Sequence, residues 1–201
     1  MDPLPVLEAT ALDGSPAASQ LGGQAVSFTL LQRVERAHLR LLWGISWSSD
    51  DSLLATASRD STIKLWTVTA GVEDSSSNRD RATLVSTQPS LILPPFPAAV
   101  TAVAFAPQCT GAGAHILAVG LESGQLGLWV VSTGSDGRLQ ALPRWHSNLY
   151  DSHAGAVTAI RWRPLPARQV LSKGSSIPCL QFASSSEDHS VRVFAAGWGT
   201  L

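Results

Sequence analysis

The chain has 201 residues, of which 44% are hydrophobic and 14% are charged, and its formal net charge is −1. This length and hydrophobic content suit one folded domain, but the charged fraction is well below the usual share of about 25%, so we expect a partner or a further part of the same protein to cover some of the surface. The near-neutral charge argues against bulk attraction to nucleic acid or to an anionic membrane.

The sequence also disfavours several kinds of site and segment. Cys109 and Cys179 have no paired spacing around them, which favours reduced thiols inside a cell over a zinc cluster or a disulfide framework. No basic residue precedes Arg33, so no signal peptide is expected, and no apolar run approaches the length of about 20 residues of a membrane span. We therefore expect a cytoplasmic protein that is also nuclear, with no membrane contact.

The N-terminal part of the chain divides into a polar segment and a first strand-rich unit. Residues 1–24 are rich in Ala, Gly, Ser and Pro and predict a disordered segment. Residues 25–34 alternate and predict the outer strand of a preceding sheet, at the start of a folded region that spans residues 25–195. A first unit, residues 38–69, has three short strands with a period of two, namely 42–47, 53–58 and 62–66.

Two further units repeat the order strand, strand, turn, strand, aromatic ring. The second unit, residues 96–131, has expected strands at 100–105, 115–120 and 125–129, and the third unit, residues 153–195, has them at 157–162, 180–185 and 190–194. Residues 196–201 are a tail. No segment has a helical period of 3.6, so the predicted fold is all-β.

The spacing between units is about 60 residues, which exceeds the period of about 40 to 45 of propeller repeats. Two polar insertions account for the excess, residues 70–81 after the first unit and residues 164–178 inside the third. We expect both to be mobile, because such stretches bury too little apolar surface to offset the loss of chain entropy.

The first unit carries a characteristic set of polar residues. His38 lies 22 residues before Asp60, which lies six before Trp66, and Thr56 and Ser58 stand on the strand between them. This resembles the WD40 repeat, in which the His, the turn Asp, a strand Ser or Thr and the Trp form a buried hydrogen-bonded chain. The resemblance implies β-propeller blades, here about three units of an incomplete propeller that normally has seven blades.

The other two units depart from this pattern to different extents. The third unit has His153, Ser184 or Ser186, Asp188 and Phe194, with a long insertion between His and Asp. The middle unit keeps only Trp129, with Phe96 and Ser123 where His and Asp would fall. None of the units has the Trp-Asp pair, but the strand pattern supports the resemblance. The implied structural hydrogen-bond network comprises His38, Thr56, Ser58, Asp60, Trp66, His153, Ser184 and Asp188.

Three strings taken in register are similar to the C-terminal repeats of the Elongator complex subunit 2 family. They begin at His38 (HLRLLWGISW, leading to SRD), at Ala99 (AVTAV, leading to AVGLE) and at Phe182 (FASSSEDHSV). The similarity covers about residues 33 to 194. It implies a non-catalytic scaffold without a cofactor or small-molecule substrate, which binds the other Elongator subunits and supports the modification of wobble uridine in transfer RNA. An alternative is a WD40 adaptor in signalling or transcription that recruits peptides or kinase-pathway partners.

Catalytic and metal sites are the competing interpretations of the polar residues. Ser58, His38 and Asp60 have the residue types of a hydrolase triad, but their place in the repeat favours a structural network. His146, His153 and His189, near Asp151 and Asp188, match no compact metal-ligand motif. We therefore expect these histidines to be exposed loop residues and not metal ligands.

Two last expectations concern the basic stretch 138–173 and the number of units. The stretch holds six basic residues and one acid, which is typical of a solvated loop. Because the related assembly handles transfer RNA, a weak contact with RNA phosphates is a hypothesis for Arg161, Arg163, Arg168 and Lys173. Three units cannot close a ring of at least about four blades, so we expect part of a longer protein that, alone, aggregates or stays partly folded.

Overall fold

The computed structural model describes residues 19–21, 24–26, 30–70, 83–107, 113–164 and 180–196. Its compact units are Met1–Arg33 and Val34–Leu201. In the first unit, β1 (Ser19–Leu21) and β2 (Gln24–Val26) pair antiparallel. The described residues contain strands but no helix, and therefore no helix that could cross a membrane.

The first blade is an antiparallel sheet in the order β3-β4-β5, with two short strands on the outer edge of β5. Its strands are β3 (Leu42–Trp47), β4 (Leu53–Ser58), β5 (Ile63–Ala70), β6 (Thr83–Val85) and β7 (Leu91–Ile92). Because β6 and β7 pair with successive stretches of β5, together they fill the fourth place of the blade.

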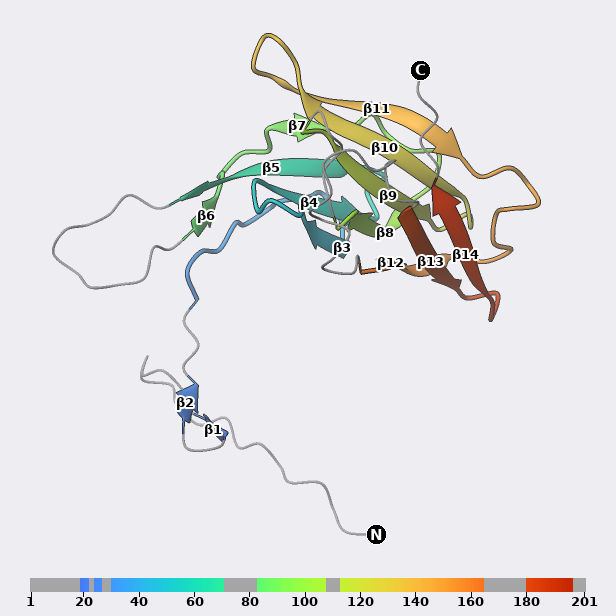
Figure 1. The fold of residues 1–201 in the computed structure, drawn as a ribbon, viewed down its shortest axis with the longest axis horizontal. Coiled ribbons are helices and arrows are strands. Elements are labelled where there is room, and N and C mark those ends of the chain that lie inside the picture. The colour runs from blue at the N-terminus through green and yellow to red at the C-terminus, as the bar shows by residue number, and fades with distance from the viewer. Residues whose placement is uncertain are drawn as a thin grey trace, which may run out of the picture. The chain divides into compact units, whose positions relative to one another are not determined.

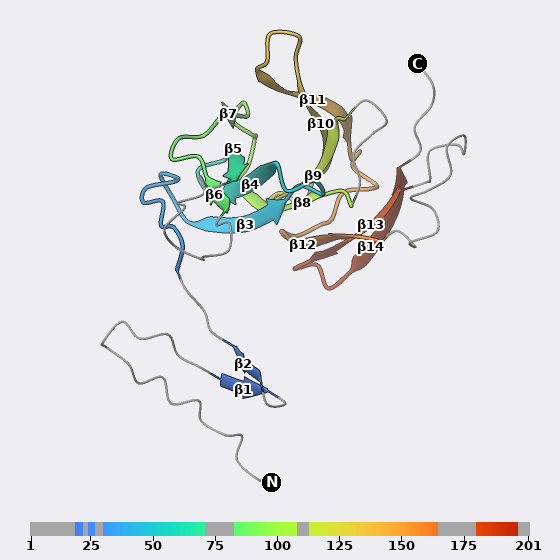
Figure 2. The ribbon, with the colours of Figure 1, turned by 60° about the vertical axis from the view of Figure 1, so that its left-hand side comes forward.

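The second and third blades repeat this order. The second blade is β8 (Val100–Phe105), β9 (His115–Leu121), β10 (Leu126–Thr133) and β11 (Leu139–His146), and the third is β12 (Val157–Trp162), β13 (Leu180–Ser186) and β14 (Val191–Ala196). Figures 1 and 2 show the three sheets following one another, with β8 in contact with both β3 and β12.

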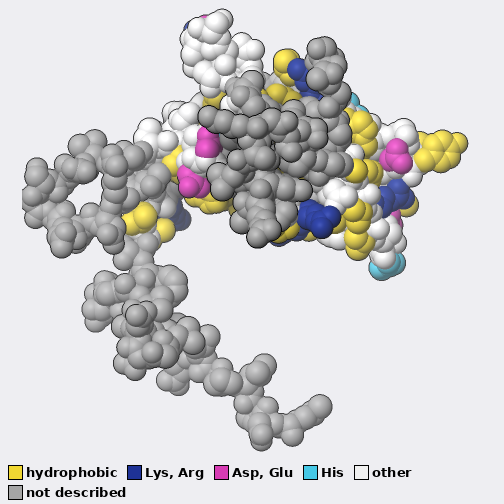
Figure 3. Space-filling view, viewed as in Figure 1, with side chains coloured by type: hydrophobic (Ala, Val, Ile, Leu, Met, Phe, Trp, Pro, Cys, Tyr) yellow, Lys and Arg dark blue, Asp and Glu magenta, His cyan; other side chains and the backbone are white. Residues whose placement is uncertain are grey.

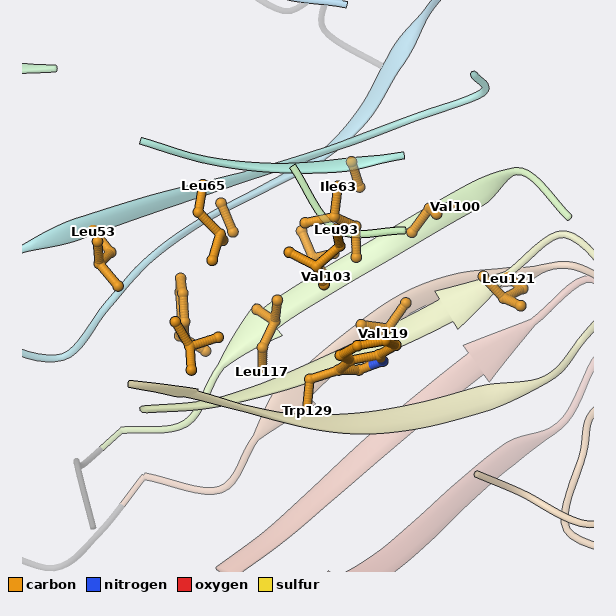
Figure 4. Packing of buried hydrophobic residues seen from close by; sticks show 14 residues of the cluster. Leu53, Ile63, Leu65, Leu93, Val100, Val103, Leu117, Val119, Leu121 and Trp129 are labelled. Carbon is orange, nitrogen blue, oxygen red and sulfur yellow. The ribbon is translucent and has the colours of Figure 1, made fainter. Parts of the chain in front are cut away.

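Two apolar layers join the blades. The first layer holds Leu65 of β5 against Val103, Leu117 and Val119 of the second blade, and Figure 4 shows these side chains pointing toward one another. The second layer joins the opposite face of the second blade to the third blade, chiefly through Ala118, Leu128, Ile160 and Phe182. Since full burial of one such large side chain is worth about 1.5–3 kcal/mol, these layers hold the blades together.

The predicted all-β fold of propeller blades is confirmed, and each of the three strands expected in every unit is present. The sequence interpretation missed the fourth strands, of which β11 is the longest. Pro143 lies within β11, and a proline is unfavourable inside a sheet because it cannot donate a ladder hydrogen bond. The structure accommodates it because β11 is an edge strand and its register with β10 shifts beside Leu128 and Trp129, where the proline needs no ladder hydrogen bond.

The interpretation of residues 25–34 as one outer strand is wrong. β2 ends at Val26, and the described residues 30–34 form no strand. An outer strand needs the edge of a sheet to pair with, and the described part of the chain contains no blade before β3. Most of residues 1–24, 70–81, 164–178 and 196–201 lies outside the described residues, as do both cysteines.

Candidate functional site

A buried hydrogen-bonded chain in the first blade connects four of the residues singled out by the sequence. The His38 side chain is fully buried, with Nδ1 3.0 Å from Asp60 Oδ2 and Nε2 2.8 Å from Thr56 Oγ1. Trp66 donates its indole N–H to the same Thr56 oxygen over 2.9 Å. The structure therefore brings His38, Thr56, Asp60 and Trp66 together, and they link the loop before β3 with β4, β5 and the turn between them.

The charges fix the direction of these hydrogen bonds. Burial opposes ionisation of Asp60, but hydrogen bonds from the Thr62 hydroxyl, the Leu39 N–H and His38 together lower the pKa of its carboxyl to about 2. Burial lowers the pKa of His38, which favours the neutral ring. A carboxylate only accepts, so His38 Nδ1 donates to Asp60, and Nε2 accepts the hydroxyl hydrogen of Thr56.

The third blade repeats this arrangement. His153 has a buried side chain, with Nδ1 3.0 Å from Asp188 Oδ2 and Nε2 2.8 Å from Ser184 Oγ. Hydrogen bonds, first from the Ser190 hydroxyl and also from the Ala154 N–H, keep the pKa of Asp188 well below its usual range. His153 is therefore not an exposed loop histidine, because its ring lies inside the blade. Phe194 stands in the place of Trp66 and stacks on Phe182 with ring centroids 5.0 Å apart.

Ser58 does not lie where a hydrolase nucleophile would. Its hydroxyl donates to the Arg40 carbonyl over 3.3 Å and accepts the Asp60 N–H over 3.1 Å, while Thr56 occupies the position beside His38 Nε2. Ser186 has the same role in the third blade, between the Gly155 carbonyl and the Asp188 N–H. Both serines hold the turn that carries the network aspartate.

The middle blade replaces the polar chain with rings and aliphatic side chains. Its register puts Val119 at the position of Thr56. Phe96 packs edge-on against Trp129, with ring centroids 5.5 Å apart. Among the described residues, the buried Trp129 Nε1 has no hydrogen-bond partner. A cavity of about 130 Å³ lies beside this aromatic pair, lined in part by Phe96, Val119, Gly127 and His146.

The remaining candidate residues lie apart from these networks. Arg161 and Arg163 are exposed, with guanidinium groups that donate to the Ile160 carbonyl and to the Gln181 side chain over 2.8 Å each. Arg168 and Lys173 lie outside the described residues. Within the described ranges no three His, Cys, Asp or Glu side chains gather closely enough to hold a metal ion.

Two hydroxyl residues of the networks escaped the sequence interpretation. Thr62 donates to Asp60 over 2.6 Å, and Ser190 donates to Asp188 over 2.7 Å. The signal was in the sequence, because both turns have a Ser or Thr two residues after the network aspartate. This side chain bonds the aspartate that closes the turn, as Asx turns commonly do.

Comparison with known proteins identifies the repeats and their relatives. The family described as WD domain, G-beta repeat matches residues 29–67, which include β3 and β4. Proteins named Elongator complex protein 2 are similar over most of the chain, with 34% identity over 79% of it for Dictyostelium discoideum, 32% over 84% for Arabidopsis thaliana and 24% over 83% for Homo sapiens. The chain spans 16%, 18% and 20% of the length of these relatives, respectively.

Proposed function

We propose that this chain, which carries WD40 repeats and is a relative of Elongator complex protein 2, is a non-catalytic scaffold segment of the Elongator complex. It holds the other subunits by protein contacts and so supports the modification of wobble uridine in transfer RNA. The observation that carries the proposal is the similarity to proteins of that name over about four-fifths of the chain.

The geometry of the polar networks supports a scaffold over an enzyme. The Thr56 hydroxyl has the neighbours of an activated nucleophile, namely His38 and Asp60, but the residue is buried and its oxygen also accepts the Trp66 N–H. A nucleophile must reach its substrate, and this oxygen is enclosed by the strands that it connects. The arrangement instead ties strands together, which gives a stiff surface for partners.

Recovery of the tagged full chain from cells tests this function. We expect the other Elongator subunits to be recovered with it, and the control variant Ser135→Ala to recover them equally, since Ser135 is exposed in the turn between β10 and β11. Recovery of signalling or kinase-pathway proteins without those subunits would contradict the proposal and favour the adaptor alternative. In cells the chain is proposed to occur in the cytoplasm and the nucleus.

A weak contact with transfer RNA is a second part of this proposal. Arg161 and Arg163 are exposed on or just after β12, so their charges are available to phosphate oxygens. Replacing Arg161, Arg163, Arg168 and Lys173 by Glu should weaken RNA binding by the reconstituted assembly and reduce its salt dependence. The exposed Arg138→Glu is the matched control. Unchanged affinity and salt slope in the fourfold variant would refute the RNA contact while leaving the scaffold role standing.

A further inference from the structure

The third strand of each blade has one position directly opposite the network hydroxyl residue of the second strand. In the first blade this position is Lys64, which pairs with Thr56, and in the third blade it is Arg192, which pairs with Ser184. In the second blade the registers put Gly127 there. A glycine therefore stands where both other blades carry a long basic side chain.

The two basic side chains fasten a loop onto their own blade. Lys64 Nζ donates to the Ala37 carbonyl over 2.7 Å, from β5 to the segment before β3. An Arg192 guanidinium N–H donates to the Tyr150 carbonyl over 2.6 Å, from β14 to the segment before β12. Both residues are half-buried, so part of each aliphatic stem packs on the blade beneath it. The second blade lacks this cover.

The backbone does not require a glycine at position 127. Among the described residues, the glycines with a positive φ lie elsewhere, at positions 113, 124 and 137. A Cβ at Gly127 would meet no described atom closer than His146 Nδ1, at 3.3 Å, and this atom belongs to a side chain that can turn. The glycine therefore leaves free a space that the chain could fill with a larger residue.

This space belongs to the cavity of about 130 Å³ in the second blade, which Gly127 lines. Most of the lining is apolar and includes Phe96 and Leu126. Two polar lining residues, Gln125 and His146, are exposed and mark the opening. Where Figure 1 draws the end of β11, Figure 3 shows hydrophobic side chains and a histidine at the surface. The cavity thus has an apolar interior and a polar mouth.

The size and the walls of the cavity suit an aromatic ring. An apolar cavity of about 150 Å³ binds benzene, so this one approaches the size that holds a single ring. Trp129 packs edge-on against Phe96 and against His146, with ring centroids 5.5 and 6.4 Å apart. A ring that enters meets Phe96 and His146 and extends this edge-to-face packing. A charged side chain is a poorer occupant, because its head group would lose water in the apolar interior.

We propose that this cavity binds the side chain of a phenylalanine in an extended segment of a partner protein. The ring would supply from another chain the apolar cover that Lys64 and Arg192 supply within their own blades. All lining residues belong to the second blade and the segment before it, and this blade has a described blade on either side. The inference rests on the proposed scaffold function, which requires contacts of this kind with other subunits.

The probe N-acetyl-phenylalaninamide tests the cavity directly. The indole N–H signal of Trp129 in NMR spectra of the full chain is the reporter, because Trp129 Nε1 lies 3.6 Å from the place of a Cβ at Gly127 and has no hydrogen-bond partner among the described residues. Titration with the probe should shift this signal to saturation. N-acetyl-alaninamide, which has the same backbone but only a methyl group, should leave it in place.

Variants that fill the cavity from inside give the matched comparison. Gly127→Lys installs the residue of the first blade, and Gly127→Leu fills the space without a charge. Both should weaken binding of the phenylalanine probe by about tenfold or more, while near-UV circular dichroism stays that of the wild type. The control Leu142→Lys adds the same charge at an exposed position of β11 outside the cavity and should bind like the wild type. An unmoved Trp129 signal, an equal shift with the alanine probe, or unchanged binding by folded Gly127→Leu would each overturn the proposal.

The same variants test whether a partner uses the cavity. The tagged full chain is offered to the remaining Elongator subunits, and the wild type and Leu142→Lys should capture them with equal affinity, whereas Gly127→Leu should do so about tenfold more weakly. Equal capture by Gly127→Leu and the wild type would overturn the contact with a partner and leave the scaffold role standing. A wild type that captures no subunit would contradict the scaffold role itself, and the titration with the probe would still decide whether the cavity binds a ring.

Discussion

His38 and Asp60 are 22 residues apart in the sequence, and their side chains meet at 3.0 Å inside the first blade. The same contact recurs at 3.0 Å between His153 and Asp188 across 35 residues of the third blade. Because each pair joins the loop before a blade to the turn between its second and third strands, the contact closes the blade.

Replacing His38 by Ala should lower the free energy of unfolding by about 2–4 kcal/mol, because it removes the buried acceptor of the Thr56 hydroxyl and one of the donors to the Asp60 carboxylate. Urea unfolding followed by tryptophan fluorescence measures the loss. The control is His189→Asn, at an exposed position with φ of 64° that Asn tolerates, and it should change stability by less than about 0.5 kcal/mol. Equal effects of the two substitutions would contradict a structural role for His38.

The first blade should lose stability as the pH falls. The pKa of His38 is lowered from 6.5 in the folded chain, so the unfolded chain binds its proton more readily and stability declines as the pH drops below about 6.5. The pKa of Asp60 is lowered to about 2, so its contribution is complete above its ordinary value of 3.8 and is lost as the pH falls through about 2.

The His38 part of this pH dependence can be isolated with His38→Gln. Unfolding free energies from about pH 8 to about pH 5 should fall more steeply for the wild type than for the variant. Parallel curves for the wild type and His38→Gln would show that His38 binds its proton equally well in the folded and unfolded chains.

Exchanging threonine and valine between equivalent positions should cost much more stability in the first blade than in the second. Thr56→Val leaves both the Trp66 N–H and His38 Nε2 without their partner and should cost about 2–4 kcal/mol. Val119→Thr puts an oxygen at the equivalent position beside the unpartnered Trp129 N–H and should cost less than about 1 kcal/mol. Thermal unfolding compares the two, and similar losses would refute the equivalence of the positions.

Gly124→Ala should be severely destabilising, by more than about 3 kcal/mol. Gly124 has a φ of 85°, and a Cβ there would overlap the carbonyl of His153 in the next blade. Gly137→Ala is the matched control, since Gly137 has a φ of 76° but no atom within 4 Å of the added Cβ, and its cost should be about 1 kcal/mol. The difference in denaturation midpoint isolates the contact with His153, and equal midpoints would argue against it.

The strands of the repeats were predictable because short apolar stretches that end in an aromatic ring recur between polar turns, although β4 and β9 are buried along their whole length and do not alternate. The sequence pattern did not predict the strand β11, which lies at the edge of a sheet. In β11, Leu139 and Ala141 are half-buried, but most of the other side chains are exposed and Pro143 interrupts the ladder. Such a strand depends on pairing with β10, a tertiary contact that local sequence does not encode.

The polar residues of the first and third blades could be found from their resemblance to the WD40 repeat, whereas their hydrogen-bond partners could not all be assigned. Ser58 and Thr56 stand on the same strand, and only the register of β4 decides that Thr56 lies beside His38. The lack of a partner for the Trp129 N–H could not be predicted either. It results from Phe96 in the place of the network histidine and Val119 in the place of the network threonine, in segments far apart in the sequence.

The claim that this chain is a scaffold segment that binds Elongator subunits can be checked by titrating the purified full chain into the remaining subunits, assembled without their own subunit 2. Isothermal calorimetry should show saturable binding that the exposed Ser135→Ala leaves unchanged and that His38→Ala weakens in proportion to its loss of folded protein. Absence of binding by the folded wild-type chain would contradict the claim.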